Sequence, residues 1–258
     1  MSAIAVSYTV DGAADAPVVV LSNSLGATRE MWGDQIPALA ERFRVVSYDT
    51  RGHGASPAPA GPYSIDDLAD DVVALLDEVG ADRAHVVGLS LGGMTALRLA
   101  AREPARVDRL AVLCTSARPE PGTFLERAAA VRSGGTAPLA PAIAGRWLTP
   151  EYAAAHPALV SRLEAMIARA DDEGYAACCE AIAALDLRDD LGRIAAPTLV
   201  VSGAEDLALP PAHQQAIAAG IAGAEWLTVE PAAHLANLEQ PAQITAALLA
   251  HLDAGGTR

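Results

Sequence analysis

The residues that could do chemistry begin with the pentapeptide Gly88-Leu-Ser-Leu-Gly92, in which one serine stands between two glycines. A short apolar run, residues 84–87, precedes it, and a helical pattern, residues 94–100, follows it. This order is typical of a nucleophile elbow, the sharp strand-to-helix turn that exposes a serine hydroxyl. The glycines are needed there because a Cβ atom would collide inside so tight a bend. We therefore predict that Ser90 is a nucleophile.

A serine hydroxyl needs a neighbouring base to take its proton, and a histidine oriented by a carboxylate can serve. His234 lies in a loop shortly after a predicted strand at residues 225–229. Ligands of open parallel sheets bind at the carboxyl ends of the strands, so we predict His234 as the base. For the remaining histidines we expect structural or solvated positions: His85 in the elbow strand, His53 in a turn, and His156, His213 and His251 on solvated helices.

Two acidic residues, Glu205 and Asp206, follow another predicted strand at residues 197–203. We predict Asp206 as the orienting carboxylate because it occupies the further, more turn-like position. Ser90, Asp206 and His234 then occur in this chain order, each after a strand, as in a hydrolytic triad built on a parallel sheet. The agreement of three placements indicates a catalytic centre more strongly than the pentapeptide does.

A hydrolytic serine also needs two N–H groups that stabilise the oxyanion formed on the substrate carbonyl. One donor follows the nucleophile, which assigns the backbone N–H of Leu91. The second is expected in the loop after the strand at residues 17–22, where Asn23-Ser-Leu-Gly26 stands. We predict the backbone N–H of Leu25 as this second donor.

The elements that must position these residues follow an alternating β/α pattern. Apolar and β-branched runs predict strands at residues 4–10, 17–22, 43–48, 84–87, 109–114, 197–203 and 225–229. Helical patterns separate most of them, for example after the capping-box sequence that begins at Ser64. Such alternation predicts an α/β fold with a mostly parallel central sheet flanked by helices.

Between residues 117 and 191 the pattern changes to short helical segments broken by prolines and glycines. We expect this stretch to form a helical cap inserted into one core domain, which residues 1–116 and 192–258 would form. A chain of 258 residues is long enough for a large α/β domain with such an insertion.

Composition excludes several classes of function. The formal net charge is −14, so nucleic acid and anionic membrane surfaces are poor partners. No apolar run is long enough to cross a bilayer, and the first residues lack a signal-peptide pattern. The three cysteines do not make a disulfide framework, so we expect a cytoplasmic protein.

Cofactor-binding motifs are missing from the sequence. No Gly-x-Gly-x-x-Gly follows a strand, no P-loop is present, and no Cys/His spacing suggests zinc. We therefore expect no cofactor and no metal. The sequence does not indicate an oligomeric state.

The chain resembles the α/β-hydrolase superfamily over its full length and, within it, the bacterial 3-oxoadipate enol-lactonases. The elbow and the Asp-Thr-Arg-Gly-His-Gly segment at residues 49–54 are shared widely across the superfamily. The narrower resemblance rests on Leu-Ser-Asn-Ser-Leu-Gly at residues 21–26 with Met31-Trp32, on Arg146-Trp147, on residues 174–182, and on residues 233–241.

The resemblance implies an α/β-hydrolase fold with a helical cap inserted after the sixth strand. It implies hydrolysis of 3-oxoadipate enol-lactone to 3-oxoadipate, in the β-ketoadipate pathway of aromatic compound catabolism. Ser90 would attack the lactone carbonyl, His234 would act as base and Asp206 would orient it. Ring opening would expel an enolate, and water activated by His234 would release the acyl-enzyme.

The small lactone implied by the resemblance carries a carboxylate, whereas the protein is strongly acidic. A local cation or N–H cluster must therefore bind the carboxylate. We take Arg146 as the first candidate for this role and Trp147 beside it as a pocket wall.

Other readings stay open. An esterase, a carbon–carbon bond hydrolase or a cofactor-free perhydrolase would share the triad and differ in the cap and the oxyanion loop. A haloalkane dehalogenase is disfavoured because its nucleophile would be an aspartate where Ser90 stands. A ligand-binding receptor on the same fold is a further alternative, which the intact triad disfavours.

Overall fold

The computed structural model describes residues 2–254, and the predicted α/β architecture is confirmed. Residue 1 and residues 255–258, the expected ends of the core domain, lie outside the described residues. One seven-stranded sheet has the strand order β1-β3-β2-β4-β5-β6-β7. The strands are β1 (Tyr8–Asp11), β2 (Val18–Ser22), β3 (Arg44–Tyr48), β4 (Ala84–Leu89), β5 (Val107–Leu113), β6 (Thr198–Gly203) and β7 (Glu225–Val229).

The sheet is parallel except at β1, which pairs antiparallel with β3. The central strands β2, β4 and β6 are buried along almost their whole length, because helices cover both faces. The register pairs Ser22 with Gly88 and Gly203 with Val229. The loops that follow β2, β4, β6 and β7 therefore start at one edge of the sheet, where the predicted site residues lie.

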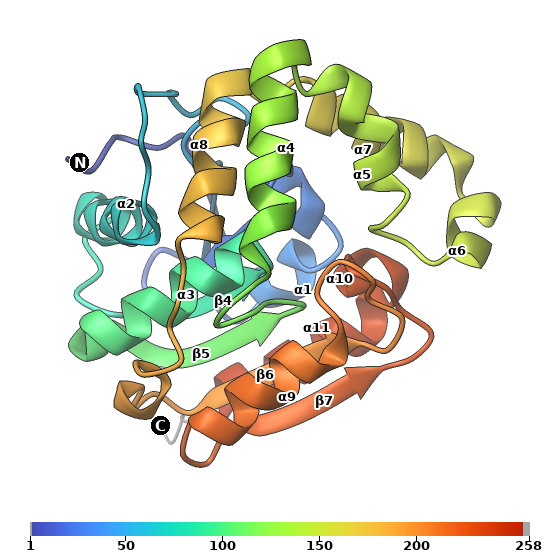
Figure 1. Ribbon diagram of the computed structural model, residues 1–258. Helices are drawn as coiled ribbons and strands as arrows, with labels where there is room; N and C mark the ends of the chain where they lie inside the picture. The colour runs from blue at the N-terminus through green and yellow to red at the C-terminus, as the bar shows by residue number, and fades with distance from the viewer. Residues whose placement is uncertain (1, 255–258) are drawn as a thin grey trace.

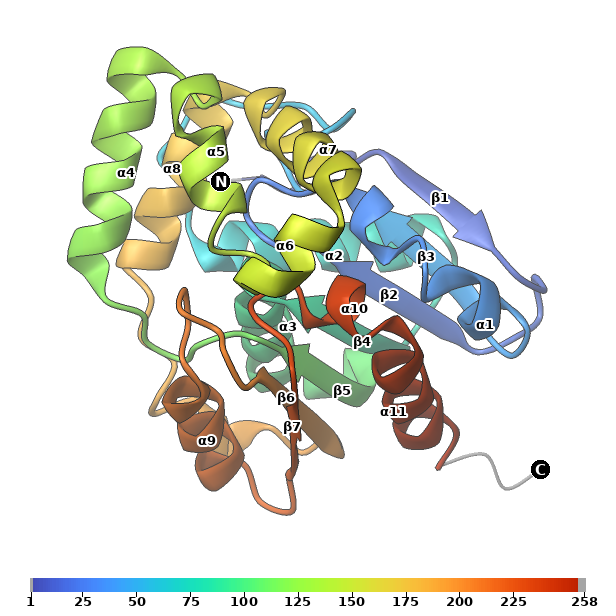
Figure 2. The ribbon, with the colours of Figure 1, turned by 90° about the vertical axis from the view of Figure 1, so that its right-hand side faces the viewer.

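The core helices flank this sheet (Figures 1 and 2). α3 and α9 pack on one face, with α2 against α3, whereas α1 and α11 pack on the other. The predicted capping box at the start of α2 is confirmed by reciprocal hydrogen bonds between Ser64 and Asp67. The core helices are α1 (Ile36–Ala40), α2 (Ile65–Glu78), α3 (Leu91–Arg102), α9 (Pro211–Gly220), α10 (Ala236–Glu239) and α11 (Pro241–Asp253).

Further helices lie above the carboxyl edge of the sheet (Figure 1). They are α4 (Pro121–Gly134), α5 (Ala140–Ala144), α6 (Pro150–Ala155), α7 (Pro157–Ala168) and α8 (Asp172–Ala183). This insertion follows β5, the fifth strand of the chain, so the expected position after a sixth strand is wrong. The described N-terminal segment supplies only one strand, β1, and so only five strands precede the insertion.

The insertion packs closely on the core. The backbone of Gly52 approaches that of Gly174 so closely that a Cβ atom on Gly52 would lie 2.6 Å from the Cα of Gly174. The N–H of Asp171 also donates to the carbonyl of Gly52 at 3.0 Å. One continuous cluster of buried side chains includes residues of both parts. The domain boundaries at residues 117 and 191 stay a prediction.

No helix within residues 2–254 is long and apolar enough to cross a membrane. The cysteines Cys114, Cys178 and Cys179 are free and buried. Burial raises the pKa of all three thiols, that of Cys179 to about 12. Protonated thiols are poor nucleophiles, so these cysteines do not compete for the role that the sequence predicts for Ser90.

Candidate active site

Ser90 occupies the sharp turn between β4 and α3 that the sequence predicts. Its φ of 57° and ψ of −116° place it in the left-handed part of backbone space, which a non-glycine residue rarely adopts. A Cβ atom on Gly88 would lie 2.2 Å from the carbonyl oxygen of Gly92, and one on Gly92 would lie 2.2 Å from that of Ser22. Both glycines are therefore required by contact and not only by flexibility.

His234 and Asp206 meet at the same sheet edge. Nδ1–H of His234 donates to Oδ2 of Asp206 at 2.8 Å, and both side chains are almost fully buried. The other carboxylate oxygen, Oδ1, accepts the N–H groups of Ala208 and Leu209 at 2.8 and 2.9 Å. Glu205 is exposed instead. The loop after β6 thus fixes Asp206, and Asp206 fixes the orientation of the His234 ring.

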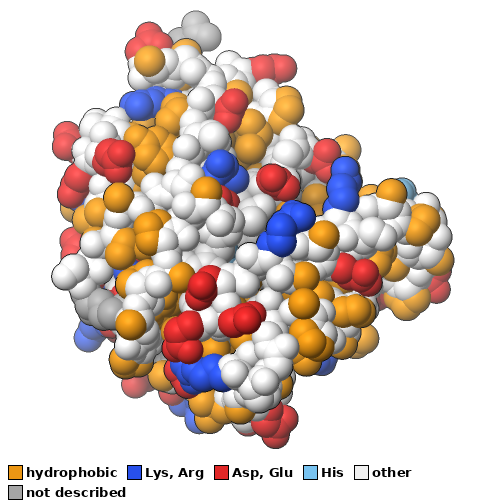
Figure 3. Space-filling view, turned by 90° about the horizontal axis from the view of Figure 1, so that it is seen from above, with side chains coloured by type: hydrophobic (Ala, Val, Ile, Leu, Met, Phe, Trp, Pro, Cys, Tyr) orange, Lys and Arg blue, Asp and Glu red, His pale blue; other side chains and the backbone are white. Residues whose placement is uncertain are grey.

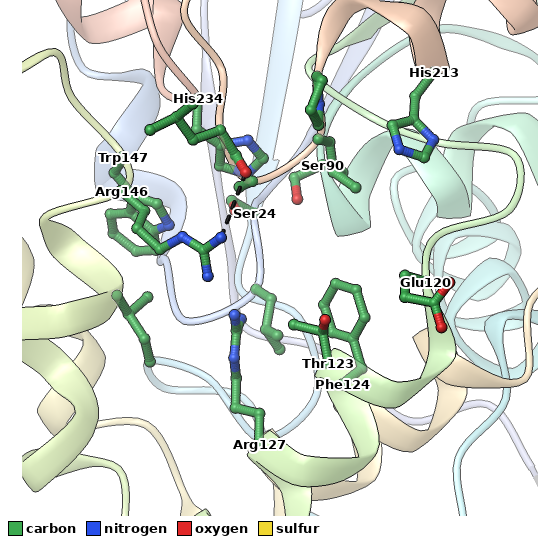
Figure 4. Close-up of a pocket in the computed structure, with 16 residues that line it drawn as sticks. Ser24, Ser90, Glu120, Thr123, Phe124, Arg127, Arg146, Trp147, His213 and His234 are labelled. Atoms are coloured by element: carbon green, nitrogen blue, oxygen red, sulfur yellow. Dashed lines mark hydrogen bonds between the residues drawn. The ribbon is translucent and has the colours of Figure 1, made fainter.

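A cavity of about 260 Å³ lies between the sheet edge and the cap, and Ser90 and His234 both line it (Figure 4). This volume is close to the lower end of the roughly 300–1,000 Å³ typical of small-molecule sites. The arrangement therefore fits a compact ligand next to the Ser90 hydroxyl.

The predicted oxyanion donors belong to Leu25, which lines this cavity, and to Leu91, which follows Ser90 as the first residue of α3. Neighbouring N–H groups are engaged: that of Gly26 donates to His53 Nε2 at 2.9 Å, and that of Gly92 to the carbonyl of Asn23 at 2.9 Å. Within residues 2–254 the N–H groups of Leu25 and Leu91 have no protein acceptor. They are available to a ligand oxygen.

The loop that carries Leu25 is held from two sides. Asn23 donates from Nδ2 to the carbonyl of Tyr48 at 2.6 Å and accepts Nε1–H of Trp32 at 3.0 Å. His53 accepts the N–H of Gly26 on Nε2, so its other nitrogen, Nδ1, carries the proton and donates to the carbonyl of Arg51 at 3.0 Å. Burial lowers the pKa of His53, which favours this neutral form. The structural role predicted for His53 is confirmed.

The cap supplies the opposite wall. Trp147 is buried and lines the cavity, as does Arg146, an exposed side chain whose Nη2 donates to the carbonyl of Leu207 at 3.4 Å. Arg127 and Glu120, for which the sequence predicted no role, also line the cavity, as does His213. Figure 4 shows Arg127 and Arg146 on neighbouring sides, with Glu120 and His213 together on another.

Two expectations about solvated histidines are wrong. His213 lies in α9 but is half-buried at the cavity, with Nδ1 at 2.9 Å from the hydroxyl of Ser116. His251 is buried under the sheet, with Nε2 at 3.0 Å from the carbonyl of Leu110. A helical pattern alone did not show which face of each helix packs on the core.

A buried carboxylate joins the His234 loop to the cap. Oε1 of Glu239 accepts the N–H and the hydroxyl of Thr149 at 2.8 and 2.7 Å. Its Oε2 accepts the N–H of Ala233, the residue before His234. The N–H of Leu235, the residue after, donates to the carbonyl of Trp147 at 2.8 Å. Both neighbours of His234 are thus hydrogen-bonded, and the cap shares in positioning it.

Comparisons with known proteins agree with this geometry. A family model described as alpha/beta hydrolase fold matches residues 17–241. The chain is 41% identical to 3-oxoadipate enol-lactonase 2 of Acinetobacter baylyi, over 92% of this chain and 89% of the relative. It is 32% identical to a provisionally named carbamate hydrolase, RutD of Caulobacter segnis, over 96% of each chain. The crystal structure of the enol-lactonase from Burkholderia xenovorans superposes with a TM-score of 0.94 at 42% identity, covering 96% of each chain.

Proposed function

Because the chain belongs to the α/β-hydrolase fold family, and its relatives include 3-oxoadipate enol-lactonases, we propose that it hydrolyses 3-oxoadipate enol-lactone to 3-oxoadipate. The reaction belongs to the β-ketoadipate pathway of aromatic compound breakdown. The observation that carries the proposal is that Ser90, His234 and Leu25, whose N–H group is a predicted oxyanion donor, all line the same cavity. Free, buried thiols support the expected cytoplasmic location.

In the acylation step, Ser90 Oγ attacks the lactone carbonyl while His234 Nε2 takes the hydroxyl proton. The carbonyl oxygen becomes an oxyanion, which the N–H groups of Leu25 and Leu91 stabilise. Asp206 holds the His234 ring with Nδ1 protonated, so Nε2 is free to accept.

Collapse of the tetrahedral intermediate breaks the ring carbon–oxygen bond. The leaving oxygen departs as an enolate, and the proton on His234 neutralises it. Ring opening leaves the acyl group on Ser90, and a water molecule deprotonated by His234 then attacks the ester. The net reaction adds one water to one lactone and, after the enol tautomerises, yields the keto acid.

The test compares substrates on the purified protein. Enzymatically generated 3-oxoadipate enol-lactone is followed by loss of its absorbance, next to p-nitrophenyl acetate under the same conditions. We expect kcat/KM for the lactone to exceed that for the ester by about 100-fold or more, a ratio that needs pocket contacts beyond the triad. A higher rate on the ester would instead favour a general esterase.

Carbamate hydrolysis is the second candidate, since a relative carries that name. A small carbamate is therefore included in the same assay. Turnover of the carbamate above that of the lactone would overturn the enol-lactonase proposal.

A further inference from the structure

A carboxylated ligand must find positive charge inside this cavity. The net charge of −14 opposes long-range attraction of an anion. On the cap face in Figure 3, basic side chains stand in small groups among acidic and hydrophobic ones. Of the described arginines, Arg127 and Arg146 line the cavity. These two side chains are therefore the arginine charges available to an anion inside the cavity.

Arg127 projects from α4 into the cavity (Figure 4). It is half-buried, and its guanidinium carbon lies 5.3 Å from the ring centre of Phe124, which also lines the cavity. Among residues 2–254 it has no ion-pair partner. Arg132, on the same helix, does form ion pairs, with Glu173 and Glu180. The cap therefore contains carboxylates that can pair with an arginine of α4, but Arg127 lies at the cavity and does not pair with them.

Arg146 differs from Arg127 in its contacts. Its side chain is exposed, and its hydrogen bond to the carbonyl of Leu207 holds it at the rim. In Figure 4 the two guanidinium groups point toward the same part of the cavity, whereas Glu120 lies on a different wall. Two like charges that converge without an acid between them repel, and a bound anion removes that repulsion.

We infer that Arg127 is the principal residue that binds the substrate carboxylate, with Arg146 in a secondary role at the rim. The inference rests on the proposed function and names the group that selects its substrate. A guanidinium offers a planar pair of donors that fits a carboxylate, and the Phe124 ring fixes its plane. The lactone ring then lies between Arg127 and Ser90.

The test uses two lactones that differ only in this carboxylate. In 5-methylfuran-2(3H)-one, a methyl group replaces the carboxymethyl group of 3-oxoadipate enol-lactone. For Arg127→Ala we expect kcat/KM on the carboxymethyl lactone to fall about 10- to 100-fold, mostly through KM, as for loss of a hydrogen bond to a charged group. On the methyl lactone the change stays within about two-fold, because only uniform binding of the carboxylate is lost.

Matched variants separate charge from position. Arg127→Lys keeps the charge without the planar pair of donors. It should therefore retain part of the preference for the carboxymethyl lactone over the methyl lactone that Arg127→Ala loses. Arg146→Ala should lower kcat/KM on the carboxymethyl lactone less than Arg127→Ala does. Arg169→Ala removes an exposed cap arginine that does not line the cavity. We expect it to leave the ratio of kcat/KM on the two lactones unchanged.

Two outcomes would overturn the inference. Equal losses on both lactones in Arg127→Ala would mean a structural role, and a larger loss in Arg146→Ala would move the anchor to Arg146. A separate measurement does not need lactonase activity: inhibition of p-nitrophenyl acetate hydrolysis by adipate, compared with adipamide. Adipate should inhibit the wild type more strongly, and Arg127→Ala should lose this difference. If the wild type does not hydrolyse the lactone but is still inhibited more strongly by adipate than by adipamide, only the proposed function is wrong.

Discussion

The two sides of the cavity hold their polar groups by different means. On the core side, Asp206 and His234 are almost fully buried and each is fixed by short hydrogen bonds. On the cap side, Arg127 is half-buried without an ion-pair partner among the described residues, and Arg146 is exposed with one long hydrogen bond. Preorganised hydrogen-bonded groups suit bond making and breaking, whereas cationic groups without an ion-pair partner are free to bind an anionic ligand. In the proposed function, the core side carries out the reaction and the cap side selects the substrate.

The largest effect should come from the core side. Ser90→Ala removes the proposed nucleophile, and we expect kcat to fall about 10⁴- to 10⁶-fold with the fold retained. Ser24 lines the same cavity and provides a matched control. Ser24→Ala should keep kcat within about ten-fold, since its hydroxyl forms no covalent bond in the proposed reaction. If Ser90→Ala hydrolysed the lactone near the wild-type rate, Ser90 would not be the nucleophile and the core side would not carry out the reaction.

Asp206→Asn tests whether the core side acts through orientation of His234. The amide would favour the wrong tautomer of the ring, and kcat should fall about 10³- to 10⁴-fold. Glu205→Gln changes the exposed neighbouring carboxylate and should leave kcat within about two-fold. Equal losses in the two variants would mean that the acidic turn, and not the bond to His234, is required.

Glu239→Gln tests the connection between the two sides. The change puts an amide NH₂ among donors from Thr149 and Ala233, so we expect a loss of about 1–3 kcal/mol in the free energy of unfolding. Displacement of the His234 loop should also lower kcat about ten-fold while KM changes little. Urea unfolding and steady-state kinetics measure these effects. Glu151→Gln, an exposed change in the cap, should alter neither.

The smallest effect concerns pH. Burial lowers the pKa of His53 below its ordinary value near 6.5, so below that pH the unfolded chain binds a proton that the folded chain does not. The contribution of the neutral His53 to the free energy of unfolding is therefore fully present above pH 6.5. It falls as the pH decreases, by up to about 1.4 kcal/mol per pH unit for one histidine. His53→Asn should reduce this slope in urea unfolding between pH 7 and 5. An unchanged slope would assign the acid sensitivity to the other buried histidines, His85 and His251, whose pKa values burial also lowers.

The sequence predicted the core side better than the cap side, for a physical reason. Ser90, Asp206 and His234 each follow a strand, and parallel strands bring their carboxyl ends to one edge whatever the helices do. Leu25 could be placed by the same rule. For Arg127, the sequence shows only a basic residue on a helix, and a solvated arginine gives the same pattern. The direction in which the Arg127 side chain points depends on how α4 packs on α8, and local periodicity in the sequence does not determine that packing.

The bonds between Trp147, Thr149 and the loop around His234 limit how this protein could be re-engineered. A cap grafted from a relative at residues 117 and 191 would still meet Glu239, which belongs to a later part of this chain, so the graft must supply a donor at the position of Thr149. The graft must also present a backbone carbonyl at position 147 to the N–H of Leu235. Exchange of specificity therefore requires a cap matched to the loop around His234, and a graft without the Thr149 hydroxyl would remove one of the hydrogen bonds that hold Glu239.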